Sequence, residues 1–97
     1  MKILIINGPN LNLLGTREPE IYGFVSMEDY LLELTTEFPN QEILYYQSNI
    51  EGELINRLQN DDFDALVINP GAFTHYSYAI ADCLKNIQIP KIELNSR

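Results

Sequence analysis

The stretch Lys2–Gly23 reads KILIINGPNLNLLGTREPEIYG and joins a short apolar run to a long connection. The run Lys2–Ile6 is continuous and rich in β-branched residues, which is typical of a parallel strand covered on both faces. The segment Asn7–Gly23 is longer than the usual strand-to-helix connection of about 2–6 residues. Its apolar side chains argue against disorder. We therefore predict that it is an active-site loop and lid.

Helices and strands are predicted to alternate along the rest of the chain. Three segments with apolar residues at helical spacing are predicted helices: 27–38, 50–58 and 76–87. Capping boxes are predicted to start the first two of them, at Ser26 and Ser48. Three further apolar runs are predicted strands: 43–46, 65–68 and 92–94.

This alternation predicts one α/β domain over residues 1–97, with a flavodoxin-like three-layer αβα fold. Its sheet is expected to be parallel, with the strand order 2-1-3-4. Ligands of such sheets bind beyond the carboxyl ends of the strands, where the strand order reverses between strands one and three. Asn7 and Asn10 follow strand one and Asn69 follows strand three, so we predict a site at that edge.

The composition excludes several classes of partner. The chain has 97 residues and a net charge of −8, which argues against binding to nucleic acid or to an anionic membrane surface. Cys83 is the only cysteine, so no internal disulfide is expected. The apolar opening is too short for a signal peptide, and no run approaches transmembrane length. A cytoplasmic protein is therefore expected.

Tyr22 is the first candidate for chemistry, and Arg17 lies five residues before it. A phenol with a pKa of about 10 is a poor base at neutral pH. A neighbouring guanidinium favours the phenolate and can lower that pKa by roughly 1–3 units. Alternatively, Tyr22 packs the loop while Arg17 pairs with Glu18 or Glu20. Spacing alone favours the alternative.

Asn10 and Asn69 are amide candidates near the ends of predicted strands. Asn10 could polarise a carbonyl or hold a water against a developing enolate. Asn69 precedes Pro70 and Gly71 at the end of strand three. Both asparagines also have a purely structural interpretation, since asparagine forms turns readily. The two interpretations stay open.

His75 is the only histidine, and it could donate a hydrogen bond to a ligand hydroxyl or be structural. Asp82 lies off the apolar stripe of its helix. We expect it to be either a solvated helix residue or a contact to a neighbouring subunit. No Cys/His cluster for zinc and no glycine-rich phosphate loop is present in the sequence. Three acids between the second helix and the third strand are more simply a solvated corner than a metal site: Asp61, Asp62 and Asp64.

Three segments together resemble one family. They are NGPNLNLLGTREPEIYG from Asn7, YYQSNIEGELI from Tyr45 and VINPGAFTHYSYAIADCL from Val67. In this order they are similar to type II 3-dehydroquinate dehydratase, over Met1 to about Glu93. The resemblance implies a flavodoxin-like fold, no metal and no other cofactor, and trimers assembled into dodecamers. It also implies an anti elimination of water from 3-dehydroquinate through an enolate, giving 3-dehydroshikimate in the shikimate pathway of aromatic amino-acid biosynthesis.

The resemblance also implies roles for individual residues. Tyr22 matches the base that removes the proton beside the ketone, and Arg17 matches the arginine that holds it as phenolate. Asn10 matches the residue that stabilises the enolate through a bound water. Three further positions match substrate-binding residues, the last of which reaches across a subunit boundary: Asn69, His75 and Asp82.

The chain departs from the family pattern after its fourth strand. There the family has a His-hydrophobic-Ser-Asn motif whose histidine protonates the leaving hydroxyl, and this chain has Asn95 at that position. The family's fifth strand and closing helix are also missing, so a chain truncated relative to its family is expected. The alternative is a non-catalytic binding or assembly subunit. A flavin-binding or phosphoryl-receiver domain is disfavoured, since Asn7-Gly8 replaces the acids that a receiver needs.

Overall fold

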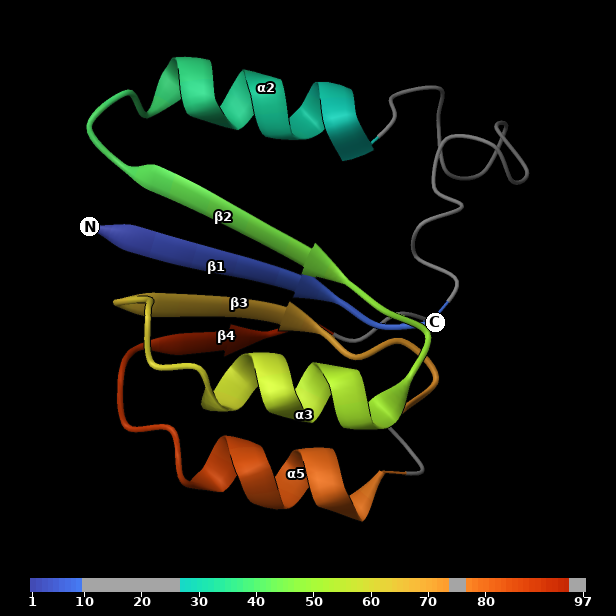
Figure 1. Cartoon of the computed structure of the whole chain (residues 1–97). Coiled ribbons are helices and arrows are strands. Elements are labelled where there is room, and N and C mark those ends of the chain that lie inside the picture. Colours follow the sequence, from blue (N-terminus) through green and yellow to red (C-terminus); the bar gives the residue numbers. More distant parts are fainter. Residues whose placement is uncertain (10–26, 74–76, 95–97) are drawn as a thin grey trace.

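The computed structural model describes residues 1–9, 27–73 and 77–94 of the chain. The elements follow one another as β1 (Lys2–Asn7), α2 (Met27–Glu37), β2 (Glu42–Gln47), α3 (Glu51–Gln59), β3 (Ala65–Asn69), α5 (Tyr78–Lys85) and β4 (Lys91–Glu93) (Figure 1). The alternation predicted from the sequence is therefore confirmed. Within the described ranges, no helix has the length and apolar character needed to cross a membrane.

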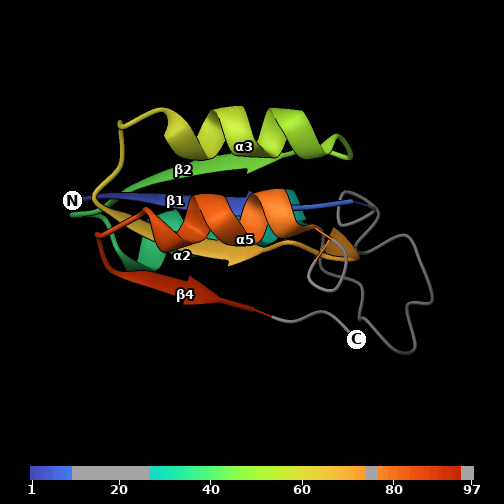
Figure 2. The same ribbon diagram turned by 90° about the horizontal axis from the view of Figure 1, so that it is seen from below.

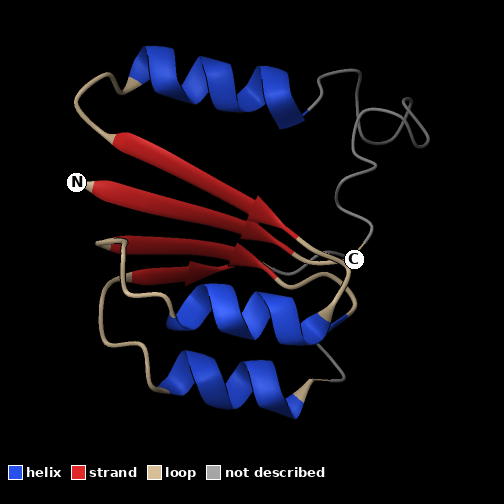
Figure 3. Ribbon diagram, viewed as in Figure 1, coloured by secondary structure: helices blue, strands red, loops and turns tan. Residues whose placement is uncertain are grey.

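The four strands form one parallel sheet in the order β2-β1-β3-β4, as predicted. Ile3 is the register partner of Ile43 on β2 and of Ala65 on β3. β4 pairs with the far side of β3. Figure 3 shows α2 on one face of the sheet and α3 and α5 on the other, which gives three layers. All four strands therefore end at the same edge.

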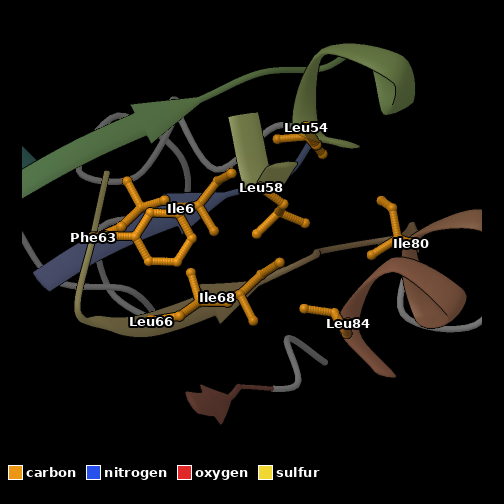
Figure 4. Packing of buried hydrophobic residues seen from close by; sticks show 9 residues of the cluster. Ile6, Leu54, Leu58, Phe63, Leu66, Ile68, Ile80 and Leu84 are labelled. Carbon is orange, nitrogen blue, oxygen red and sulfur yellow. The ribbon is translucent and has the colours of Figure 1, made fainter. Parts of the chain in front are cut away.

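The core lies between the sheet and the α3/α5 layer. Nine buried apolar side chains form one cluster: Leu4, Ile6, Leu54, Leu58, Phe63, Leu66, Ile68, Ile80 and Leu84. Figure 4 shows Phe63 lying against Ile6 and Leu66, with Ile80 and Leu84 approaching from α5. Leu4 and Ile6 point into this core, whereas the alternate residues Ile3 and Ile5 point to the α2 side. An uninterrupted apolar run is what a strand covered on both faces requires.

The α2 side of the sheet is closed less completely. None of the residues of α2 is buried, and Tyr30 and Phe38 are 50% and 52% exposed. The apolar side of this helix, which the spacing of its residues predicts, is therefore only partly covered. The physical reason is that α2 packs mainly against the edge strand β2. A cavity of about 520 Å³ remains between α2 and the sheet, where Met27 and Leu34 face Val67.

The capping box predicted at Ser48 is also wrong. α3 begins at Glu51, and its N-cap Ile50 makes no side-chain capping bond and is 58% exposed rather than buried. The Ser48 hydroxyl instead accepts from the Ile50 amide at 3.0 Å and donates to Glu53 at 2.6 Å. The box predicted at Ser26 lies outside the described residues.

The helix α5 has the side-chain cap that α3 lacks. Its N-cap Ser77 accepts from the amide of Ile80 at 2.9 Å, which satisfies one of the free donors of the first turn. Figure 2 shows α3 and α5 running side by side over one face of the sheet. The two helices thus form one layer that packs against β1 and β3.

Candidate active site

Three side-chain amides form a row at the carboxyl edge of the sheet. Asn7 is the register partner of Gln47 on β2 and of Asn69 on β3. Register partners in a parallel pair project to the same face, and Asn7 and Asn69 both line the α2-side cavity. The structure thus brings Asn7 and Asn69 together where the strand order reverses, as the topology predicted.

Asn7 is a buried polar residue with a specific partner. The residue is 5% exposed, and its Nδ2 donates to the phenol oxygen of Tyr45 at 3.3 Å. Burial raises the pKa of Tyr45 above its ordinary value of 10.0, and the hydrogen bond from Asn7 opposes part of that rise. The Tyr45 phenol therefore gives up its proton less readily than a solvated tyrosine.

Gln47 holds the beginning of the connection that follows β1. Its Nε2 donates to the carbonyl oxygen of Gly8 at 3.1 Å and to Oδ1 of Asn49 at 3.2 Å. The Ser48 amide donates to the carbonyl oxygen of Asn7 at 3.2 Å. Sequence reasoning missed Gln47. The sequence feature that points to Gln47 is its position directly after the predicted strand 43–46. Asn7 has the same position after Lys2–Ile6.

Asn69 combines a turn with an outward donor. Its Oδ1 accepts from the amide of Gly71 at 3.1 Å, so the turn interpretation is confirmed. Within residues 1–9, 27–73 and 77–94, its Nδ2 has no hydrogen-bond partner. Structural and functional interpretations are therefore compatible, because the oxygen shapes the turn and the nitrogen is left to donate to an oxygen atom of a ligand.

Four of the six predicted site residues lie outside the described residues: Asn10, Arg17, Tyr22 and His75. Asp82 is described, and it lies exposed on α5. That helix covers the face of the sheet opposite to the cavity that Asn69 lines (Figure 1). The single chain therefore does not bring Asp82 to Asn69.

The acidic corner is held by partners within the chain. Asp62 pairs with Arg57 at 2.7 Å, and Asp64 accepts from the amide of Lys2 at 2.8 Å. The hydrogen bond from Arg57 lowers the pKa of Asp62. In the part of the chain that the structure describes, no group of three His, Cys, Asp or Glu side chains could hold a metal ion. The corner stands at the amino edge of the sheet, since Lys2 begins β1.

The chain matches the sequence model of a known family, described as Dehydroquinase class II, over residues 1–95. It is 52% identical over 98 residues to the 3-dehydroquinate dehydratase of Thermotoga petrophila, covering 98% of this chain and 67% of that protein. It is 55% identical over 103 residues to the protein of the same name from Lachnoclostridium phytofermentans, covering 98% and 69%.

Solved structures agree with the sequence matches. The type II dehydroquinase of Butyrivibrio crossotus superposes with a TM-score of 0.83 at 52% identity, over 96% of this chain and 68% of that one. The type II dehydroquinase of Propionibacterium acnes gives a TM-score of 0.85 at 38% identity, over 95% and 66%. The chain therefore belongs to the class II dehydroquinase family.

Proposed function

We propose that this chain acts as a 3-dehydroquinate dehydratase, a hydro-lyase that removes water from 3-dehydroquinate to give 3-dehydroshikimate. The observation that carries the proposal is the family match over residues 1–95, together with relatives of that name at 52% and 55% identity. The amide row at the carboxyl edge supports it, because that edge is where such sheets bind ligands. The reaction serves the shikimate pathway.

In the proposed mechanism, Tyr22 removes the proton beside the ketone and Arg17 keeps it as the phenolate. The electron pair of the broken C–H bond moves to the ketone oxygen as an enolate, which Asn10 stabilises through a bound water. Collapse of the enolate then expels the hydroxyl on the opposite face of the ring, where a proton is needed to release it as water.

Three further residues are proposed to hold the substrate: Asn69, His75 and Asp82. Asn69 has a free Nδ2 among the described residues, which suits a substrate oxygen. Asp82 is exposed on the other side of the sheet, and we propose that it serves the site of a neighbouring subunit. This fits a cytoplasmic homo-oligomer built from trimers, and light scattering of the purified chain measures the assembly.

The two halves of the reaction can be followed separately. Asn95 stands where the resemblance places the acid histidine, and an amide does not protonate a leaving group as imidazolium does. We therefore expect this chain to remove the proton faster than it expels water. Deuterium exchange beside the ketone, followed by NMR in D₂O, measures the first half. Ultraviolet absorption of the conjugated enone measures the second.

Tyr22→Phe is expected to abolish the deuterium exchange while the fold is retained. The matched control is Tyr78→Phe, because Tyr78 is 90% exposed on α5 and should leave exchange unchanged. Exchange that persists in Tyr22→Phe would place the base elsewhere. Calorimetry showing that dehydroquinate binds, with no exchange in the parent chain, would indicate a non-catalytic subunit. If the parent chain shows no binding of dehydroquinate and no deuterium exchange, the proposed function is contradicted.

A further inference from the structure

Two glycines at the carboxyl edge each pack against the proline beside the other. A Cβ on Gly8, after β1, would overlap the carbonyl group of Pro70, whose carbon lies 2.6 Å from that position. A Cβ on Gly71, after β3, would lie 3.1 Å from the carbonyl oxygen of Pro9. Only glycine allows the first of these contacts. The two segments therefore interlock, and we call these four residues the glycine–proline lock.

Backbone hydrogen bonds hold both sides of the lock. The amide of Gly8 donates to the carbonyl oxygen of Asn69 at 2.8 Å, and the amide of Phe73 donates to the carbonyl oxygen of Pro70 at 3.2 Å. Gly71 adopts a φ of +63°, and in this left-handed conformation its amide reaches Oδ1 of Asn69 at 3.1 Å. Both oxygens of Asn69 are thus engaged by the lock.

The strand β2 also contributes a hydrogen bond to the glycine–proline lock. Gln47 donates to the carbonyl oxygen of Gly8 at 3.1 Å, so the Gly8 peptide is held by β2 as well as by β3. Gly8, Pro70 and Gly71 are all buried. A shift of either segment therefore disturbs packing and hydrogen bonding in the other.

We propose that Gly8 and Gly71 are positioning residues, and that the lock holds the Asn69 side chain with its nitrogen toward the ligand. While Oδ1 accepts from the Gly71 amide, Nδ2 is the donor left for an oxygen atom of the ligand. If residue 71 leaves the left-handed conformation, its amide no longer donates to Oδ1 of Asn69. The Asn69 side chain is then free to rotate. The ligand being dehydroquinate rests on the proposed function.

The test uses the full chain and two substitutions at one position. Gly71→Ala places a β-carbon in the left-handed region, which is costly for alanine, whereas Gly71→Asn places one there with a residue that tolerates it. The control is Gly52→Ala, because a Cβ on Gly52 meets nothing within 4 Å. Gly8→Ala is unsuitable as a test, because its Cβ would overlap the carbonyl group of Pro70 and could prevent folding.

The first readout is amide hydrogen exchange without ligand, measured by NMR. Gly71→Ala should speed exchange at the Gly8 amide by roughly tenfold or more, the size expected for left-handed alanine. The amides of Ile5 and Ile68 should be unaffected. Gly71→Asn should recover most of the protection, and Gly52→Ala should change nothing at Gly8. Equal acceleration along β1 and β3, or no acceleration at Gly8, would overturn the lock.

The second readout is the dissociation constant of dehydroquinate by calorimetry. Gly71→Ala should weaken binding by roughly tenfold, with Gly71→Asn closer to the parent, because only the alanine loses the left-handed turn. Equal affinities in the alanine variant and the parent would show that the lock does not orient Asn69. If the parent chain binds no dehydroquinate, the proposed function fails while hydrogen exchange still decides whether the lock exists.

Discussion

Asn7 donates a hydrogen bond from its side-chain amide to the phenol oxygen of Tyr45 across β1 and β2, at 3.3 Å. Asn7 is 5% exposed, so bulk solvent has little access to replace this acceptor. A buried amide that loses its partner is costly. This hydrogen bond therefore contributes to the stability of the sheet and also positions Asn7 in the candidate site.

Tyr45→Phe should destabilise the fold by about 1 kcal/mol at neutral pH, because Asn7 keeps its burial and loses its acceptor. Urea unfolding followed by circular dichroism measures the loss. Tyr78→Phe serves as the control, since Tyr78 is 90% exposed. The raised pKa of Tyr45 adds a dependence on pH. Its contribution is fully present below pH 10.0 and is lost as pH rises through the higher folded pKa. The phenylalanine variant should lack that alkaline loss.

Asp62 should make stability sensitive to acid. Its pKa is lowered, first by the hydrogen bond from Arg57. Its contribution is therefore present above its ordinary value of 3.8 and disappears as pH falls through the lower folded pKa. The parent should be more stable than Asp62→Asn at pH 7, and the gap should close in strong acid. Asp61→Asn is the control. A gap independent of pH would mean that charge is not the cause.

Leu66→Ala should cost about 2–5 kcal/mol, the usual range for removing a buried leucine side chain. Leu66 is 1% exposed in the centre of the core, whereas Leu32 on α2 is 68% exposed. Leu32→Ala should therefore stay within about 0.5 kcal/mol of the parent. Urea midpoints of the three chains give the comparison. Similar losses in both variants would mean that the outer face of α2 is covered in solution.

Glu53, rather than Glu51, should support the start of α3. Ser48 donates to the carboxylate of Glu53 at 2.6 Å, so Glu53→Gln should destabilise by about 1 kcal/mol, close to the loss of a cap. Glu51→Gln should have less effect, because α3 does not use the Ser48–Glu51 box. Thermal unfolding of the two variants at the same pH decides between them. A larger loss in Glu51→Gln would restore the box predicted from the sequence.

The topology could be predicted because each apolar run and each helical stripe has one simple interpretation. Lys2–Ile6 is apolar at every position after the lysine, and its shortness and β-branched residues favour a doubly covered strand. The same topology placed Asn7 beside Asn69. Gln47 also follows a predicted strand, but its pairing with Asn7 depends on the register of β1 and β2, which only the structure shows.

Other features depend on packing that no local pattern contains. The apolar stripe of α2 predicts a buried face, but α2 packs mainly against the edge strand β2, so Tyr30 and Phe38 stay about half exposed. Ser48 has an acid both three and five residues ahead of it. The Ser48 hydroxyl donates its hydrogen bond to the second of these acids, Glu53, a choice that the spacing alone does not reveal.

The central place of β1 carries a consequence for biosynthesis. Ile3 is synthesised before either of its register partners, Ile43 and Ala65. β1 must therefore remain apolar and unpaired until β2 and β3 have been synthesised. Nascent chains of this protein should depend on protection of β1 during translation, and that dependence should end once β3 has cleared the exit tunnel.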